Sequence, residues 1–373
     1  MIDQYKIIPP LKIYTEKGHA DTKDWLKYLI HPIRAWWGDG TSEWKTWALD
    51  FEFYKSLFVL TDEIVESDAV FLPMTVNYYI DKNQLGLVND FISKSEAVGK
   101  ITYAWIDGDH QILYDHPKCI FLKYSGYKSQ LKHNEFILSG DVKQDLLIEY
   151  FNGQLITRNK NEYPLIGFDG IATYPIFRLA GLILKNILTG LLHHSKSTQY
   201  VPNPVLPALL KRKQILNRLK VLKDINTNFN IRNSFAFGTV GGNKNARTEY
   251  INNIIESDYI LCYRGAANYS LRFYESLCLG RIPLFIDTDC KLPFEDQINW
   301  SDICIWVNAS ELTRIGEIVV DFHHSMTNNQ FVEKQVYCRE LWVNYLSKEG
   351  FYNHFQMYLK NELRDSIIAS HIK

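Results

Sequence analysis

The sequence predicts an α/β fold with two domains, and three observations support this. The chain has 373 residues, enough for two domains that each bury their own core. Short apolar runs rich in β-forming residues occur in both halves. In the C-terminal half, two such runs flank an amphipathic helical stretch, which predicts a βαβ unit and hence a parallel sheet.

The segment 259–286 carries that βαβ prediction. The apolar run 259–263 is typical of a buried parallel strand, and Arg264 and Gly265 end it. Gly280 supplies a left-handed stop after the helix, and 282–286 is a second strand. The helix is expected over about 270–279, with four residues at three- and four-residue spacing on its inner side: Leu271, Tyr274, Leu277 and Cys278.

Polar residues gather where this unit should bind a ligand. Ligands of parallel sheets bind beyond the carboxyl ends of the strands. That edge is followed by a helix N-terminus, whose free amides and dipole favour an anion. The side chains expected there suit a nucleotide diphosphate, and they are Arg264, Gly265, Asn268, Ser270 and Arg272.

The domain boundary is expected near Pro164. Asn152-Gly153 and the polar stretch 158–161 precede it, and the strand-like 165–168 follows. We therefore expect an N-terminal domain over 1–163, a nucleotide-binding domain over 164–345, and a helical tail over 346–373. The further strands expected in the first domain are 69–73, 101–106 and 118–123.

Composition excludes several functional classes. The net charge is −1 and no long Lys/Arg block occurs, so we expect no nucleic-acid partner. The densest basic stretch, 211–223, has a helical apolar pattern and forms either a solvated face or a contact with a membrane surface or acceptor lipid. Six cysteines without C-x-x-C spacing predict free thiols in a reducing compartment.

Two further features bear on membranes and sugars. The apolar run 179–192 is too short for a membrane span and is interrupted by Lys185 and Asn186, and no signal peptide is recognised. Five tryptophans gather near the start of the chain, and they serve either packing or acceptor-sugar stacking: Trp25, Trp36, Trp37, Trp44 and Trp47.

The C-terminal motif resembles the nucleotide-sugar half of the exostosin family of glycosyltransferases. The pattern is Arg264-Gly265, Ser270-x-Arg272-x-x-Glu275-x-Leu277-x-x-Gly280-x-Ile282-Pro283, then Leu292-Pro293-Phe294 and Trp300. Phe168-Asp169-Gly170 followed by Arg178 is similar to the strand, turn and basic helix that open the family's C-terminal domain. Gly108-Asp109-His110 is similar to an element of its N-terminal domain.

The resemblance implies a fold and a reaction. The fold is GT-B, in which two Rossmann-like domains face each other across a cleft and a C-terminal helix crosses back to the first domain. The reaction transfers a sugar, from a UDP-sugar and with inversion, to a hydroxyl of a glycan or lipid-linked glycan such as a capsule or O-antigen. Animal members carry a membrane anchor and this chain shows none, so we expect a bacterial, cytoplasmic enzyme, either free or at the inner face of the membrane.

Site roles follow from the chemistry of sugar transfer. Glu275 is expected to accept both ribose hydroxyls, the alternative being a surface ion pair with Arg272. Arg178, Arg264 and Arg272 are expected to neutralise the diphosphate, helped by Ser270 and the amides near Gly265. Asp109 or His110 is the candidate base, although 107–110 is also an ordinary turn sequence. Asp169 and His133 are weaker candidates.

We expect no metal cofactor. Asp107/Asp109 and Asp287/Asp289 have the Asp-x-Asp spacing that holds a divalent cation in another glycosyltransferase architecture, but both are also turn sequences. Two alternative functions stay open at this point. One is a nucleotide-sugar epimerase of the same fold, and the other is a non-catalytic carbohydrate-binding scaffold.

Overall fold

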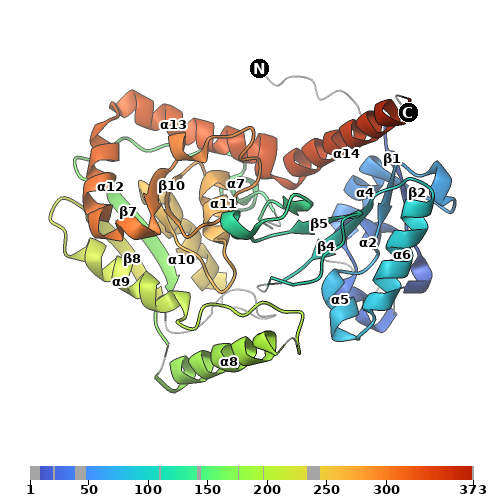
Figure 1. Ribbon diagram of the computed structural model, residues 1–373. Coiled ribbons are helices and arrows are strands. Elements are labelled where there is room, and N and C mark those ends of the chain that lie inside the picture. Colours follow the sequence, from blue (N-terminus) through green and yellow to red (C-terminus); the bar gives the residue numbers. More distant parts are fainter. Residues whose placement is uncertain are drawn as a thin grey trace.

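The computed structural model describes residues 9–19, 22–37, 48–108, 111–140, 144–174, 176–195, 197–232 and 244–371. Two parallel sheets, each flanked by helices, lie side by side (Figure 1). The predicted fold class, with two Rossmann-like α/β domains, is confirmed.

The N-terminal sheet has six strands in the order β2-β1-β3-β4-β5-β6, and every pair is parallel. All residues of β3 and β4 are buried, because helices cover both faces of the sheet. The strands are β1 Leu11–Tyr14, β2 Phe58–Thr61, β3 Ala69–Phe71, β4 Thr102–Ile106, β5 Cys119–Lys123 and β6 Glu135–Ile137. Their helices include α2 His31–Trp37, α4 Ala48–Leu57, α5 Val76–Asp81 and α6 Leu85–Ala97.

The C-terminal sheet has five parallel strands in the order β11-β10-β9-β7-β8. The predicted βαβ unit is present as β9, α11 and β10, and Gly280 follows the helix at φ +66°. The strands are β7 Leu165–Ile171, β8 Asn226–Arg232, β9 Tyr259–Cys262, β10 Ile282–Asp287 and β11 Ile305–Asn308. The main helices are α9 Ala208–Lys220, α10 Lys244–Ile255, α11 Leu271–Cys278, α12 Ile315–His324 and α13 Asn328–Leu341.

The inner side of α11 differs from the prediction. Leu271 is 38% exposed, whereas Glu275 is 4% exposed. Leu271 is the first helical residue, at the mouth of a cavity, and Glu275 lies one turn further in. The carboxylate is buried because two polar partners surround it there.

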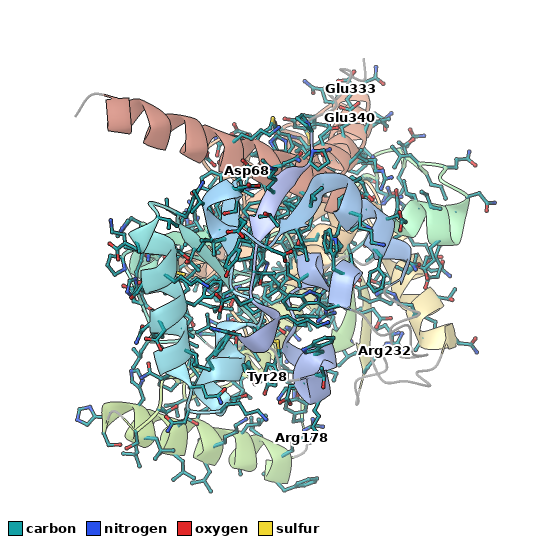
Figure 2. All side chains as sticks on the ribbon, turned by 90° about the vertical axis from the view of Figure 1, so that its right-hand side faces the viewer. Tyr28, Asp68, Arg178, Arg232, Glu333 and Glu340 are labelled. Atoms are coloured by element: carbon teal, nitrogen blue, oxygen red, sulfur yellow. The ribbon has the colours of Figure 1, made fainter. Side chains whose placement is uncertain are left out.

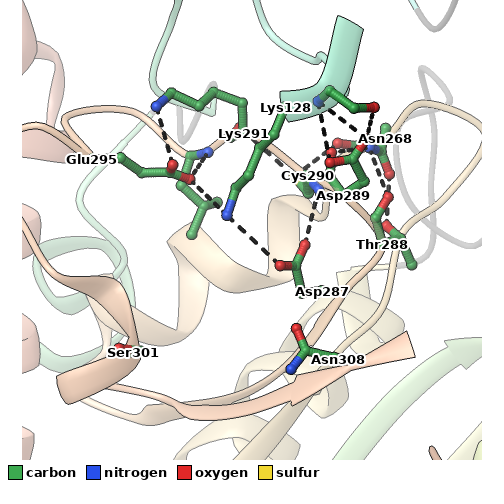
Figure 3. A network of polar contacts seen from close by, with 12 residues as sticks. Lys128, Asn268, Asp287, Thr288, Asp289, Cys290, Lys291, Glu295, Ser301 and Asn308 are labelled. Carbon is green, nitrogen blue, oxygen red and sulfur yellow. Dashed lines mark hydrogen bonds and ion pairs between the residues drawn. The ribbon is translucent and has the colours of Figure 1, made fainter. Parts of the chain in front are cut away.

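The two domains meet through a polar network at the ends of β5 and β10 (Figure 3). The backbone N–H of Lys128 donates to the carbonyl of Asp289 (2.9 Å), and the N–H of Ser129 donates to the Asp289 carboxylate (3.2 Å). The buried Asn268 side chain donates to the carbonyls of Gly126, Thr288 and Asp289, each at 3.2 Å. Asp287 and Asp289, the second Asp-x-Asp pair, therefore help to join the domains.

Helix α14, Lys348–His371, extends from the C-terminal sheet to the N-terminal one (Figure 1). Gln356 donates to the carbonyls of Leu57 (3.1 Å) and Pro9 (3.3 Å). The Phe355 ring lies edge-on to Tyr103 and Trp105 of β4, at 6.2 and 6.3 Å between ring centroids. The last helix is therefore part of the cover of the first sheet.

The tryptophans near the start of the chain pack against protein. Trp25 is 6% exposed and stacks on Trp37, with 6.0 Å between ring centroids. Trp36 and Trp37 are partly buried against the core. Trp44 and Trp47 lie outside the described residues.

One helix in the described part of the chain is long and apolar enough to cross a membrane. It is α8, Ile176–His194, with a mean hydropathy of 1.3 and none of the apolar window buried. From the sequence we expect an apolar run over 179–192 that Lys185 and Asn186 interrupt, whereas the helix continues through both residues and has 19 residues in all.

Candidate active site

A cavity of about 860 Å³ opens beyond the carboxyl ends of β7, β8 and β9. The first turns of α11 and α9 form part of its wall, and α8 and the segment before α9 form the opposite side. The sequence-predicted residues Arg264, Gly265, Ser270, Arg272 and Glu275 all line it. The topology brings them together because the chain passes from β9 into α11 at the edge of the sheet where parallel strands end.

The N-terminus of α11 faces this cavity. Ser270 is the N-cap residue, and its hydroxyl caps no amide of its own helix. Both Ser270 and Leu271 line the cavity. The free amides of this first turn and the hydroxyl of Ser270 are therefore donors that suit a phosphate oxygen.

Glu275 is a buried carboxylate one turn deeper. An Arg247 guanidinium nitrogen lies 2.8 Å from its Oε1, and the Tyr250 hydroxyl donates to its Oε2. Burial, together with this carboxylate, raises the pKa of Tyr250 well above its usual value, so the phenol stays protonated and donates. Glu275 thus forms its ion pair with Arg247 and not the surface pair with Arg272 that the sequence allowed.

Arg272 lies under the carboxyl end of β7. Its guanidinium donates to the carbonyl of Asp169 (2.8 Å) and its centre lies 4.5 Å from the centroid of the Phe168 ring. Gly170 makes this approach possible, since a Cβ there would lie 2.8 Å from the Arg272 nitrogen and the backbone φ is +153°. Arg272 is held by the edge of the sheet rather than by a counter-ion.

Arg212 is a further cation of the cavity, although the sequence pattern favours a solvated face at this position. It donates to the carbonyls of Ile171 (2.8 Å) and Arg264 (2.7 Å), at the ends of β7 and β9. Burial and the nearby Arg272 lower the pKa of Arg212 to about 10. The prediction of a solvated face was wrong at this position, and a sequence signal existed: Arg212 lies three and four residues before the buried Ile215 and Leu216.

Arg264 connects the cavity to the N-terminal domain. Its guanidinium donates to the Tyr127 hydroxyl at 2.5 Å and to the Ala266 carbonyl at 2.8 Å, and the residue is 7% exposed. Within the described part of the chain, the buried Nε atoms of Arg212, Arg264 and Arg272 have no hydrogen-bond partner. Three arginines at one cavity, each with a buried Nε donor that has no protein partner, favour an anionic ligand.

Arg232 and Arg247 also line the cavity, and no sequence motif predicted that either residue belongs to the site. Arg232 donates from Nε and Nη2 to the two carboxylate oxygens of Asp169, whose side chain is fully buried, and the same Nη2 lies 3.0 Å from Glu249. Asp169, the weaker candidate base, therefore has a structural ion pair. Arg232 reaches the cavity from the end of β8 and Arg247 from α10, and only folding brings these elements together with α11.

Comparison with known proteins identifies this region. Residues 212–322 match the family model described as the Exostosin GT47 domain. This part of the chain is similar to the exostosin family.

Three relatives are similar to part of this chain. A probable glucuronoxylan glucuronosyltransferase, IRX7 from Arabidopsis thaliana, is 31% identical over 105 residues, which is 27% of this chain and 23% of that protein. The probable beta-1,4-xylosyltransferase IRX10L from the same plant is 33% identical over 72 residues, 19% of this chain and 17% of its own. Exostosin-1 from Drosophila melanogaster is 34% identical over 73 residues, 20% of this chain and 10% of its own.

The matched region thus spans less than a quarter of each of these relatives. Among solved structures, UDP-GlcNAc 2-epimerase from Methanocaldococcus jannaschii is 11% identical, with 88% of this chain and 98% of that chain covered and a TM-score of 0.24. Nothing about this chain follows from so low a score.

Other predicted residues lie away from the exostosin-domain cavity or outside the described residues. Asp109 and His110, the candidate bases, belong to the latter. Arg178 is on α8, exposed, with its guanidinium 4.4 Å from the centroid of the Tyr174 ring, and it is not among the residues that line the cavity (Figure 2). His133 is exposed.

The Asp-x-Asp sequences have structural partners where they are described. The Asp107 carboxylate accepts a hydrogen bond from the N–H of Gly108 (2.7 Å), as in a turn. Lys128 Nζ lies 3.7 Å from Asp287 and 3.4 Å from Glu295 (Figure 3). Among the described residues, no group of three or more His, Cys, Asp or Glu side chains is placed to hold a metal ion.

Proposed function

We propose that this protein is a glycosyltransferase that binds a nucleotide-sugar, with UDP as the nucleotide, in the exostosin-domain cavity. One observation carries the proposal. The helix N-terminus at Ser270, three arginines that each have an unpaired Nε donor, and the buried carboxylate of Glu275 all line one cavity. Anion-binding donors beside a ribose-binding acceptor suit a nucleoside diphosphate, and the similarity of residues 212–322 to the exostosin family supports the same ligand.

Different residues of the cavity bind different parts of the nucleotide-sugar. Glu275 accepts the ribose hydroxyls, because each carboxylate oxygen has a second lone pair beyond the bond to Arg247 or Tyr250. Ser270, the first-turn amides, Arg264 and Arg272 stabilise the charge that develops on the diphosphate as the sugar leaves. Arginines and helix amides supply this stabilisation in our proposal, and no metal is required.

The sugar goes with inversion to a hydroxyl of a growing cell-surface polysaccharide, such as a capsule or O-antigen. Relatives named as glucuronosyl- and xylosyltransferases support a glycan acceptor and a sugar donor of that general kind. We assign the base to Asp109 or His110, in the segment that follows β4. General-base catalysis contributes about 10² to 10⁴ in rate, so loss of the true base lowers kcat by that factor.

The test begins with nucleotide binding. Thermal unfolding of the full chain is followed with UDP, GDP, CMP, dTDP and ADP, for the native protein and for Arg272→Met. Arg314→Met is the matched control, since Arg314 is exposed and lies outside the cavity. We expect UDP to stabilise the native protein and the control, by about 2.7 kcal/mol at a hundred times Kd, and Arg272→Met much less.

Product analysis then separates the remaining alternatives. A transferase consumes its UDP-sugar at a useful rate only with an acceptor, whereas an epimerase converts the donor alone. If no nucleotide stabilises the protein, the proposal is wrong and a carbohydrate-binding scaffold takes its place. Loss of turnover in a chelator that Mn²⁺ or Mg²⁺ restores contradicts the metal-free mechanism.

A further inference from the structure

Helix α8 turns its apolar side toward solvent. It lies at the edge of the molecule, away from both sheets (Figure 1). Phe177, Leu184, Leu188 and Leu191 are 78, 58, 51 and 62% exposed. Their spacing of seven, four and three residues places them on one side of the helix. Ile176, Ile187 and Leu192 extend the same surface and are 87, 42 and 52% exposed.

The opposite side of α8 is the less exposed one, and it carries fewer apolar residues, which are Leu179, Leu182 and Ile183. Asn186 donates to the carbonyls of Pro204 (3.0 Å) and Val205 (3.4 Å), and Thr189 is half-buried. No residue of α8 is fully buried. A surface helix of a water-soluble domain has the reverse arrangement, with its apolar side on the core. The apolar side of α8 therefore needs a partner outside the fold.

The segment that contains α8 has an unusual charge. Between Asp169 and Asp224 there is no Asp or Glu, whereas the whole chain has a net charge of −1. The same segment contains nine basic residues: Arg178, Lys185, Lys196, Lys211, Arg212, Lys213, Arg218, Lys220 and Lys223. An apolar face within a segment of one positive sign is complementary to an anionic lipid surface, because the acyl region takes the leucines and the headgroups take the cations.

We propose that α8 is a membrane-docking helix that lies in the plane of an anionic lipid bilayer. Lys185, beside the apolar face, would contact the headgroups, while Phe177, Leu184, Leu188 and Leu191 enter the boundary with the acyl chains. A second copy of this chain fits the surface less well, because two such segments repel each other.

The helix lies in the plane and does not cross the bilayer. The chain enters α8 from β7 and returns to α9, and Arg212 of α9 donates to Ile171 at the end of β7 (2.8 Å). A single crossing would place these two elements on opposite sides of the membrane, which that contact forbids. Docking in the plane of the bilayer covers the apolar face and keeps β7 and α9 on the same side of the membrane.

Docking of α8 has a consequence for the cavity. Leu182, Lys185 and Asn186 of α8 line it, so the helix forms one wall. A bound membrane therefore brings this wall of the cavity close to the headgroups. The inference goes beyond the proposed reaction and does not depend on it, since it rests on the exposure and charge of α8.

Vesicle flotation of the full chain tests the proposal. The probes are vesicles of phosphatidylcholine alone and vesicles that also contain phosphatidylglycerol, each at low and high salt. We expect the protein to float with the anionic vesicles and to be released by salt. The double variant Leu188→Glu/Leu191→Glu should lower the partition coefficient by at least about tenfold, since each leucine loses its apolar burial in the bilayer.

Val65→Glu is the matched control, because Val65 is 65% exposed and lies in the other domain. It should float as the native protein does, and circular dichroism should show all three proteins folded. The proposal is overturned if the native protein ignores anionic vesicles or if the double variant floats as well as the control. It is also overturned if sedimentation shows a dimer that the double variant dissolves and no vesicle binds, since the partner is then a second copy.

Discussion

Glu275→Gln tests the ribose role of Glu275 with the smallest change in shape. The native carboxylate has Arg247 on Oε1 and the Tyr250 hydroxyl on Oε2, and its side chain is 5% exposed. Glutamine keeps one acceptor oxygen and replaces the other with an NH₂ donor. Two protein donors and two ribose hydroxyls then compete for a single oxygen, so the ribose loses its charged acceptor.

The expected loss follows from the strength of a hydrogen bond to a charged group. Such a bond contributes about 1.5–3 kcal/mol, which corresponds to about 10- to 100-fold in Kd. The variant also leaves Arg247 without its carboxylate, and a broken buried ion pair destabilises a protein by about 3–5 kcal/mol. Because the Arg247 side chain is 31% exposed, solvent screens it and we expect a smaller loss of unfolding free energy.

Calorimetric titration with UDP and with 2′-deoxy-UDP separates the two effects. The native protein should prefer UDP by about tenfold or more, and Glu275→Gln should show almost no preference. Glu249→Gln is the control, because Glu249 lies on α10 with Arg247 but is 59% exposed. The reasoning is refuted if Glu275→Gln keeps the preference for UDP while its unfolding free energy falls. Glu275 would then be only the counter-ion of Arg247.

Two further predictions concern the fold around the site. Asp169→Asn should lower the free energy of unfolding in urea by about 3 kcal/mol, because it removes a fully buried carboxylate from Arg232. Glu249→Gln removes the exposed carboxylate near the same arginine, and it should lower this free energy by at most about 1 kcal/mol. Equal losses would contradict the buried-pair reading of Asp169. The six cysteines are buried and free, and burial raises the pKa of four of them to about 12: Cys262, Cys278, Cys290 and Cys338. A thiol reagent at neutral pH should therefore label the native protein very slowly. In denaturant the same reagent should label all six cysteines. Rapid labelling of the native protein would show that these thiols are not shielded.

The sequence determined the local elements and one edge of the site. Two continuous apolar runs, a period-3.6 pattern and a single Gly stop located β9, α11 and β10 closely, because a parallel strand buried on both faces is a continuous apolar run. Arg264, Ser270, Arg272 and Glu275 were placed at one cavity from the motif alone, since they all lie within a dozen residues of a strand end. The prediction that Leu271 lies on the inner side of the helix was wrong, because hydrophobic periodicity does not show where a polar residue such as Glu275 is buried.

Only the tertiary structure decided which residues from distant elements join that edge. Arg212 and Arg232 reach the cavity because the strand order β9-β7-β8 places the end of β8 and the start of α9 near the end of β9. Arg247 reaches it from α10, which packs on β7. The tertiary structure also decided that Asp287 and Asp289 join the domains, and that α8 shows its apolar side to solvent. The sequence carries the periodicity of a helix, but the side that it buries depends on what the rest of the fold places next to it.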